Sequence, residues 1–163
     1  MKVLIVYDSL YGSTEKIARA MGEALGGDAK VVKVTEVKPE AIAASNLLIV
    51  GSPTQGGRTT PAMKTFLDGL TAESLAGKRV AAFDTRMKGF FVKMFGWAAN
   101  RIEASFKEKK ANSTAQPQGF FVKGGKGQLV DGEVERAATW AKSVVAGVPT
   151  SQMPGEYQQK QKE

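Results

Sequence analysis

Residues 6–21, VYDSLYGSTEKIARAM, decide the fold, because they join an apolar run to an amphipathic helix through a few small and hydroxylated residues. The run at residues 2–7 has the β-branched, uninterrupted apolar composition of a strand that is buried on both faces. Residues 15–25 repeat apolar side chains at helical spacing. A strand that leads directly into a helix indicates an α/β fold, with the connecting loop at the N-terminus of the helix.

The composition fits one folded domain. The chain has 163 residues, of which 42% are hydrophobic and 24% are charged, close to the averages of globular proteins. We expect a single domain over residues 1–148, followed by a polar, mobile tail over residues 149–163. No apolar run is long enough to span a membrane and no signal-peptide pattern occurs, so we expect a cytoplasmic protein.

Two residue types that serve much of enzyme chemistry are missing, because the chain contains no cysteine and no histidine. This excludes disulfides, thiolate nucleophiles and iron–sulfur ligation, and we expect no metal site. The formal net charge is +7, and residues 86–110 alone contain seven basic residues against two acidic ones. Such a charge favours an acidic protein partner, whereas no recognised motif supports nucleic-acid binding.

Further strands and helices alternate along the chain. Strand patterns occupy residues 31–34, 46–51 and 79–83, with an interrupted fifth strand at 113–122. Helix patterns occupy residues 61–70, 91–106 and 132–146. Ser13 is expected to cap the first helix and Gly26 to end it. The alternation predicts a doubly wound parallel sheet of five strands with helices on both faces, whose ligand loops lie beyond the carboxyl ends of the strands.

Three loops follow the first, third and fourth predicted strands. The first, residues 8–14, combines a helix N-terminus with hydroxyl groups and a glycine, which suits a phosphate group, although taken alone it could equally be a helix cap. It has neither the Walker A pattern nor Gly-x-Gly-x-x-Gly. The second loop, GSPTQGGRTTP at 51–61, is too long for a simple connection. The third is DTRMKG at 84–89.

Together these loops resemble those of the flavodoxin family, whose first loop follows the pattern Ser/Thr-x-Thr-Gly-x-Thr and binds the phosphate of FMN. The matching positions are Ser9, Leu10, Tyr11, Gly12, Ser13 and Thr14. SPTQGG at 52–57 is similar to the family's second loop, which flanks the isoalloxazine, and FDTRMKG at 83–89 is similar to its third. The resemblance covers residues 2–147 and implies a short-chain flavodoxin-like domain with strand order 2-1-3-4-5.

The resemblance also implies which other residues contact FMN. From the second loop they are Pro53, Thr54, Gln55, Gly56 and Gly57, and from the third they are Asp84, Thr85, Arg86, Met87, Lys88, Gly89 and Phe90. A related deazaflavin would use the same loops.

Three features depart from the family pattern. Tyr11 replaces a small hydroxylated residue of the phosphate loop, and Gln55 stands where many members have a stacking aromatic residue. Phe90 would either stack on the flavin or start the core stripe of the next helix. The chain is basic, whereas flavodoxins are typically acidic. We therefore hypothesise that Arg86 and Lys88 make the flavin easier to reduce, unless both side chains point into solvent.

The sequence favours an FMN-binding electron carrier, which needs no side-chain acid or base. Asp8 and Asp84 are expected to bond turn amides rather than to form a catalytic pair. One alternative is an FMN-dependent NAD(P)H or quinone reductase, or a protoporphyrinogen-oxidase-like flavoenzyme, because MKTFLDGL at 63–70 resembles a helix of the quinone reductases. A flavin-free binding module of the same fold is another. We expect an acidic redox partner and a monomer or weak dimer.

Overall fold

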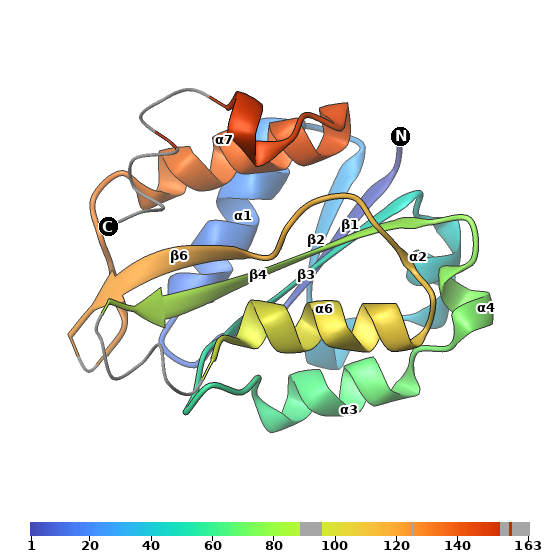
Figure 1. The fold of residues 1–163 in the computed structure, drawn as a ribbon, viewed down its shortest axis with the longest axis horizontal. Coiled ribbons are helices and arrows are strands. Elements are labelled where there is room, and N and C mark those ends of the chain that lie inside the picture. Colours follow the sequence, from blue (N-terminus) through green and yellow to red (C-terminus); the bar gives the residue numbers. More distant parts are fainter. Residues whose placement is uncertain (89–95, 125, 154–156, 158–163) are drawn as a thin grey trace.

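A mostly parallel sheet runs through the middle of the protein and carries helices on both faces (Figure 1). The structure is a computed structural model that describes residues 1–88, 96–124, 126–153 and 157. The strands are β1 (Val3–Tyr7), β2 (Ala29–Lys33), β3 (Leu47–Pro53), β4 (Arg79–Met87), β5 (Asn112–Ser113), β6 (Gln118–Lys123) and β7 (Gln128–Leu129). The helices are α1 (Ser13–Leu25), α2 (Pro39–Ala44), α3 (Pro61–Gly69), α4 (Ala72–Leu75), α6 (Ala98–Glu108) and α7 (Glu133–Ala146), with 3-10 turns η1 (Val34–Glu36) and η2 (Thr150–Gln152).

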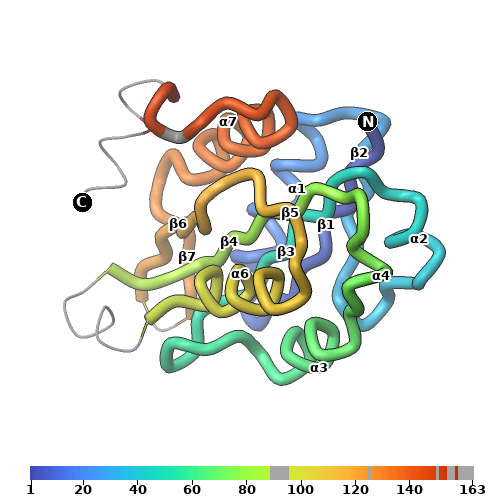
Figure 2. The backbone as a smooth tube through the Cα atoms, turned by 45° about the vertical axis from the view of Figure 1, so that its right-hand side comes forward, coloured from blue at the N-terminus to red at the C-terminus, as the bar shows by residue number. Residues whose placement is uncertain are grey.

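The strand order confirms the predicted topology and adds to it. The order is β2-β1-β3-β4-β6-β7, and β5 also pairs with β4. Since β5 and β6 are the two halves of the interrupted fifth strand, the order 2-1-3-4-5 is confirmed (Figure 2). β7 pairs with β6 in the antiparallel direction, so the prediction of five strands and a wholly parallel sheet was wrong at this edge. A strand of two residues is too short to leave a periodic pattern.

The two faces of the sheet are covered by different helices. α1 and α7 pack on one face, and α3 and α6 pack on the other. On the first face, Phe83, Phe120 and Trp140 meet edge to face, with ring centroids 6.1 to 6.3 Å apart. Aromatic pairs in this geometry stabilise a core beyond the apolar area that they bury. Among the described residues, no helix is long and apolar enough to span a bilayer.

β4 is longer than the sequence indicated. The predicted strand ends at residue 83, but β4 continues to Met87 because β6 pairs with it from Phe83–Gln118 to Met87–Val122. β6 is held in turn by a buried ion pair of α7, in which Arg136 donates to the Gly119 carbonyl at 2.5 Å and Glu133 accepts from the Phe121 amide at 2.7 Å. Asp84, Thr85, Arg86 and Met87 therefore belong to a strand and not to a loop.

Helix boundaries follow the predictions with two differences. Gly12, in the left-handed conformation with φ 95°, is the N-cap of α1, so the predicted cap Ser13 is instead the first helical residue. Gly26 ends α1 as predicted. α6 begins only at Ala98, so the predicted helix over residues 91–106 was wrong at Gly96 and Trp97, and its residues 91–95 lie outside the described residues.

Part of the expected C-terminal tail packs on the core. Met153 and Tyr157 are each 4% exposed and belong to the cluster beneath α1 and α7. The Tyr157 hydroxyl donates to Gln118 Oε1 at 2.5 Å. Met153 and Tyr157 are therefore part of the core, and Tyr157 also bonds the first residue of β6.

Replacement of Tyr7 by Phe tests the bond that ties the end of β1 to α1. The Tyr7 hydroxyl donates to Glu15 Oε1 at 2.5 Å, and burial together with this carboxylate raises the pKa of Tyr7 to about 12. We expect Tyr7→Phe to lower the free energy of unfolding by about 1 kcal/mol at neutral pH, the usual net value of one hydrogen bond. The folded protein holds this proton more tightly than the unfolded chain. The stabilisation is therefore complete below about pH 10 and is lost as the pH rises toward about 12.

Urea unfolding of both proteins at neutral pH and across this alkaline interval measures the difference. Tyr11→Phe is the matched control, because the Tyr11 side chain is 65% exposed, and it should leave the stability unchanged. A Tyr7→Phe deficit that stays constant through the alkaline interval would contradict the expectation.

Candidate functional site

The loop between β1 and α1 is shaped by its own side chains. Asp8 accepts from the Ser9 amide at 2.9 Å, and Ser9 Oγ accepts from the Gly12 amide at 3.0 Å. The first backbone bond of α1 runs from the Lys16 amide to the Gly12 carbonyl at 3.0 Å. The amides of Ser13, Thr14 and Glu15, in the first turn of α1, are therefore left at the positive end of the helix, where they can bind an anion.

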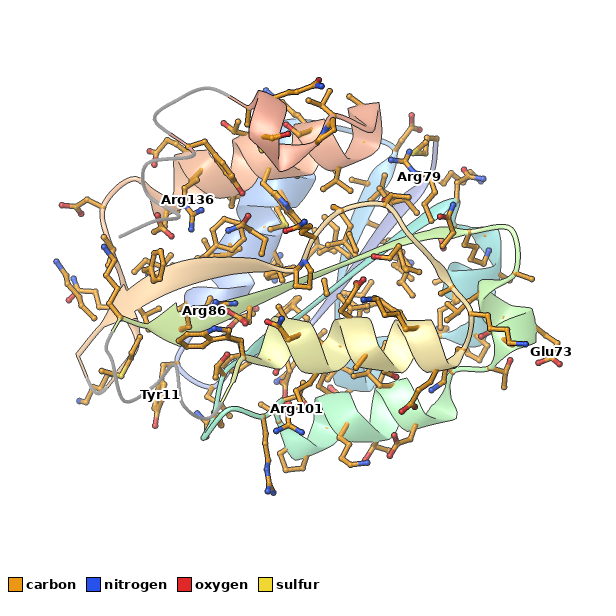
Figure 3. The ribbon with its side chains drawn as sticks, in the orientation of Figure 1. Tyr11, Glu73, Arg79, Arg86, Arg101 and Arg136 are labelled. Carbon is orange, nitrogen blue, oxygen red and sulfur yellow. The ribbon has the colours of Figure 1, made fainter. Side chains whose placement is uncertain are left out.

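Tyr11 does not fill the interior of this loop. Its side chain is 65% exposed and that of Leu10 is 50% exposed. Figure 3 shows Tyr11 at the end of the molecule where β4 also ends. At residue 11 the small hydroxylated side chain of the family pattern is therefore replaced by one that lies mostly in solvent. Thr14 is buried and its hydroxyl shares a 2.8 Å hydrogen bond with that of Thr85 on β4.

The second loop folds into a tight turn. The backbones of Gln55 and Arg58 exchange two hydrogen bonds of 2.8 and 2.9 Å across Gly56 and Gly57. Gln55 is exposed at this turn. At the far end of the loop, the Thr60 hydroxyl donates to Asp8 at 2.5 Å, which ties the second loop to the first. Asp8 thus bonds a loop amide, as the sequence predicted, and also the Thr60 hydroxyl, which the sequence did not predict.

Asp84 and Arg86 form a buried ion pair at the end of β4. Two bonds of 2.7 Å join the guanidinium to the carboxylate, whose side chain is 0% exposed while that of Arg86 is 13% exposed. Asp84 also accepts from the Ala99 amide at 2.9 Å and so caps α6. Burial raises the pKa of Asp84, while Arg86, the Ala99 amide and the Thr54 hydroxyl oppose that rise.

The surroundings of Arg86 fix its guanidinium in place. The group lies 4.1 Å from the centroid of the Trp97 ring, and a Cβ at Gly119 on β6 would overlap it. Only glycine at residue 119 allows this close approach. Lys88 lies instead over the Phe121 ring, 4.9 Å from its centroid.

These contacts change the hypothesis about redox tuning. Arg86 neither points into solvent nor acts as an isolated cation, because the carboxylate of Asp84 balances its charge. The field that β4 presents at the site is that of a neutral pair, which falls off faster with distance than the field of a single charge. Lys88, which is exposed, remains the one of the two that can act as a net positive charge.

The three segments meet around one pocket of about 100 Å³. Its lining includes eleven of the predicted residues: Ser9, Leu10, Tyr11, Ser13, Thr14, Pro53, Thr54, Gln55, Thr85, Arg86 and Met87. The predicted residues Gly12, Gly56, Gly57, Asp84 and Lys88 are adjacent but do not line it. Gly89 and Phe90 lie outside the described residues.

The sequence analysis missed one part of this lining. Val122, Gly124 and Gly127 also face the pocket, from the hairpin that joins β6 to β7. The run GGKG at 124–127 was the available signal, because clustered glycines between apolar segments mark a tight turn.

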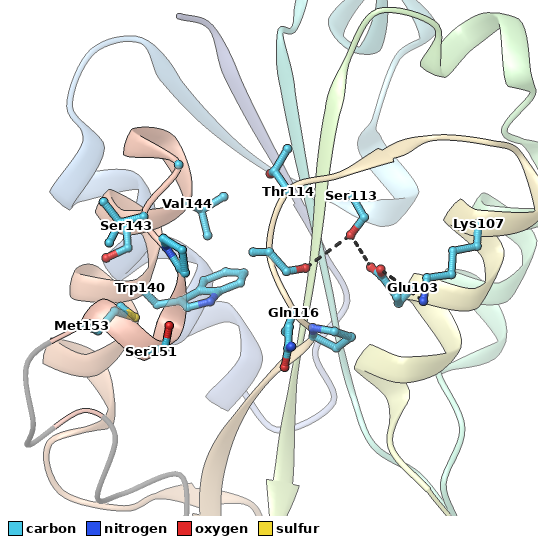
Figure 4. A pocket seen from close by; sticks show the side chains of 15 residues that line it. Glu103, Lys107, Ser113, Thr114, Gln116, Trp140, Ser143, Val144, Ser151 and Met153 are labelled. Atoms are coloured by element: carbon cyan, nitrogen blue, oxygen red, sulfur yellow. Dashed lines mark hydrogen bonds and ion pairs between the residues drawn. The ribbon is translucent and has the colours of Figure 1, made fainter.

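A larger cavity of about 880 Å³ lies elsewhere, over the sheet edge between α6 and α7 (Figure 4). Ser113, whose hydroxyl donates to Glu103 at 2.8 Å, lines it opposite Trp140. No residue of the three candidate segments belongs to its lining. This cavity is therefore separate from the candidate site.

The fold and the site together define an α/β protein that binds a phosphate-bearing ligand beyond the carboxyl ends of its strands. The chain belongs to the flavodoxin family, whose model, described as "Flavodoxin", matches residues 5–140. Membership of this family implies FMN as the cofactor.

Similarity to individual proteins agrees with this assignment. A flavodoxin of Aquifex aeolicus is 32% identical over 91 residues, which cover 52% of this chain and 49% of that protein. An NAD(P)H dehydrogenase (quinone) of Acidovorax ebreus is 36% identical over 109 residues, covering 50% of this chain and 54% of that protein. The chain thus spans about half the length of these curated relatives.

A solved structure has a similar fold over nearly the whole chain. The structure of a flavodoxin from the domain Archaea has a TM-score of 0.75 and 22% identity, and the match covers 90% of this chain and 97% of that one.

The residues present fit the phosphate end of FMN. Neutral hydroxyls of Ser9, Ser13 and Thr14 surround the open amides of a helix N-terminus, which is a donor set suited to a phosphate. The pocket, at about 100 Å³, is smaller than the roughly 300 Å³ or more of sites that enclose a whole ligand, so it has room for only part of FMN. FMN supplies the redox chemistry when bound, and the protein supplies its position and its surroundings.

Removing one member of the Asp84–Arg86 pair should destabilise the protein strongly. Arg86→Gln leaves a buried carboxylate without its charged partner, and we expect a loss of about 3 kcal/mol in the free energy of unfolding. Asp84→Asn/Arg86→Gln should cost clearly less than the sum of the two single changes. Lys88→Gln is the control for loss of a positive charge at the end of β4 and should cost less than about 0.5 kcal/mol.

The double-mutant cycle compares denaturant unfolding of the unsubstituted protein, Asp84→Asn, Arg86→Gln and the double variant. Additive effects of Asp84→Asn and Arg86→Gln would mean that the two side chains do not interact in solution.

Proposed function

We propose that this protein is an FMN-dependent electron carrier that passes electrons between redox partner proteins. The observation that carries the proposal is the convergence of the two loops and the end of β4 on one pocket. Both nearby carboxylates already have partners, since Asp8 bonds Thr60 and Asp84 bonds Arg86. Such a site suits a cofactor that performs the chemistry itself, with the protein as its holder.

The proposal extends to the individual residues and to the setting of the protein. The candidate residues of the three segments, Gly89 and Phe90 included, are proposed to bind FMN. The domain is proposed to span residues 1–148, with Met153 and Tyr157 packed on its core. The protein is proposed to be cytoplasmic and a monomer or weak dimer. These points rest on the sequence and on the family.

A reductase is the second candidate, and one observation favours it. The similarity to the NAD(P)H dehydrogenase (quinone) of Acidovorax ebreus, at 36% identity, is as high as that to the flavodoxin of Aquifex aeolicus, at 32%. Such an enzyme would oxidise NAD(P)H directly at the flavin, whereas a carrier would need a reductase to supply its electrons.

Reconstitution with FMN tests the function. We expect the desalted protein to retain a yellow chromophore and to take up two electrons in separate one-electron steps during photoreduction. It should oxidise NADH or NADPH no faster than free FMN does. Direct two-electron bleaching with rapid NAD(P)H oxidation would favour the reductase, and no retained flavin would favour a binding module without a cofactor.

The rim of the pocket has the composition of a docking surface. Leu10, Tyr11 and Met87 are 50%, 65% and 46% exposed, and all three line the pocket. Lys88, which follows Met87, is also exposed, and so is Arg58, which pairs with the pocket-lining Gln55. An apolar centre with a charged rim is typical of protein interfaces, and a positive rim is complementary to carboxylates. We therefore propose an acidic redox protein as the partner.

Salt dependence tests the sign of the partner. With an acidic single-electron redox protein, the bimolecular rate of electron transfer should fall several-fold as ionic strength rises, because salt screens the attraction. Arg58→Glu should lower this rate at low salt. Lys30→Glu makes the same charge change at an exposed residue of β2 and should have a much smaller effect. A rate that rises with salt would contradict the proposal.

A further inference from the structure

The hairpin between β6 and β7 reaches the pocket from a side that none of the three predicted segments covers. Val122 pairs with Leu129 and Lys123 with Gln128, and the turn is closed by a 3.2 Å bond from the Gly127 amide to the Gly124 carbonyl. Val122, Gly124 and Gly127 all line the pocket. The site therefore has a fourth wall.

Gly127 brings this hairpin into contact with the phosphate loop. A Cβ at residue 127 would lie 3.3 Å from Ser13 Oγ and 3.6 Å from Tyr11 Cδ2. Its φ of 65° is also unfavourable for any residue with a side chain. The backbone of residue 127 thus rests directly against the hydroxyl of Ser13, at the helix N-terminus that suits a phosphate.

The phosphate loop itself supplies no positive charge. Across residues 8–14 the single charged side chain is Asp8, which is negative, and the next charged residue, Glu15, bonds Tyr7 and Arg19. A phosphate monoester carries a charge of about −1.5 to −2 at pH 7. Dipoles and hydroxyls stabilise part of this charge, and a cation beside them adds attraction that the loop lacks.

Lys126 can supply this positive charge. It immediately precedes Gly127, it is exposed, and no hydrogen bond or ion pair engages it among the described residues. Its four-carbon stem is flexible, so its ammonium group can reach a phosphate held at Ser13. Lys123 belongs to the same hairpin, but it follows the pocket-lining Val122 on the strand and therefore points to the opposite face of the sheet.

We propose that Lys126 recognises the phosphate of the bound flavin and makes the site prefer the phosphorylated cofactor, FMN, over riboflavin. The inference rests on the proposed function, because it requires that the pocket binds a flavin. The hairpin positions Lys126 through the contact of Gly127 with Ser13, and the ammonium group neutralises charge that the first loop leaves unpaired.

Comparison of two flavins isolates the contribution of the phosphate. Dissociation constants of FMN and riboflavin are measured by flavin fluorescence on flavin-free protein, for the unsubstituted chain, Lys126→Gln and Lys123→Gln, at low and high salt. We expect Lys126→Gln to weaken FMN binding about five- to tenfold at low salt, the size of one partly exposed charged hydrogen bond. Riboflavin binding should change less than twofold, and Lys123→Gln should change neither.

Two further measurements exclude a merely structural effect. Inorganic phosphate should compete with FMN on the unsubstituted chain and compete less well on Lys126→Gln. Gly127→Ala should weaken FMN binding although Lys126 is intact, because the added Cβ pushes the hairpin away from Ser13. Lys126→Arg, which keeps the charge, should retain most of the affinity for FMN.

The outcomes separate this inference from the function on which it rests. An equal loss for FMN and riboflavin in Lys126→Gln, or no loss for either, would overturn the inference while leaving FMN binding intact. Failure of the unsubstituted chain to bind either flavin would overturn the proposed function, and the inference with it.

Discussion

The Asp84 carboxylate organises the candidate site, because it joins the end of β4 to the start of α6, where the second loop is also attached. Arg86 binds it through two 2.7 Å bonds, and the Ala99 amide binds it at 2.9 Å, which fixes where α6 begins. Thr54 of the second loop accepts from the preceding amide of that helix, Ala98, at 3.0 Å. The carboxylate is fully buried, so the hydrogen bonds from Arg86 and from the Ala99 amide also lower the free-energy cost of holding a charge there. The end of β4, the start of α6 and the second loop are therefore held as one unit.

The sequence predicted the features of the site that depend on neighbours along the chain. The junction at residues 6–21 sets a strand, a loop and a helix in order, and this local pattern was enough to place an anion site at the start of α1. Gly51–Pro61 could be identified as a functional loop from its length and its glycines. The parallel order of the strands then follows from right-handed crossovers, which bring these loops to the same edge of the sheet.

The features that the sequence did not predict depend on contacts between distant residues. Residues 84–87 have the polar composition of a loop, yet they form a strand because β6 lies beside them and is clamped by Glu133 and Arg136. The partner of Arg86 is two residues away, but the pairing needs the space left by Gly119 and the ring of Trp97. The hairpin between β6 and β7 pairs residues that are close in sequence, but the contact of Gly127 with Ser13 depends on the packing of the whole sheet.

The positive side chains discussed above fall into two groups, those in buried ion pairs and those exposed to solvent. Arg86 and Arg136 are paired with Asp84 and Glu133 inside the protein, so they orient strands and helices and contribute little field beyond their neighbours. Arg58, Lys88 and Lys126 are exposed, and their fields extend into solvent over about 8 Å at physiological salt. The long-range field that accompanies the net charge of +7 therefore comes from exposed side chains such as these. Beside the pocket, Asp84 balances the charge of the pocket-lining Arg86, so this pair is neutral as a whole and contributes less field there than a single cation would.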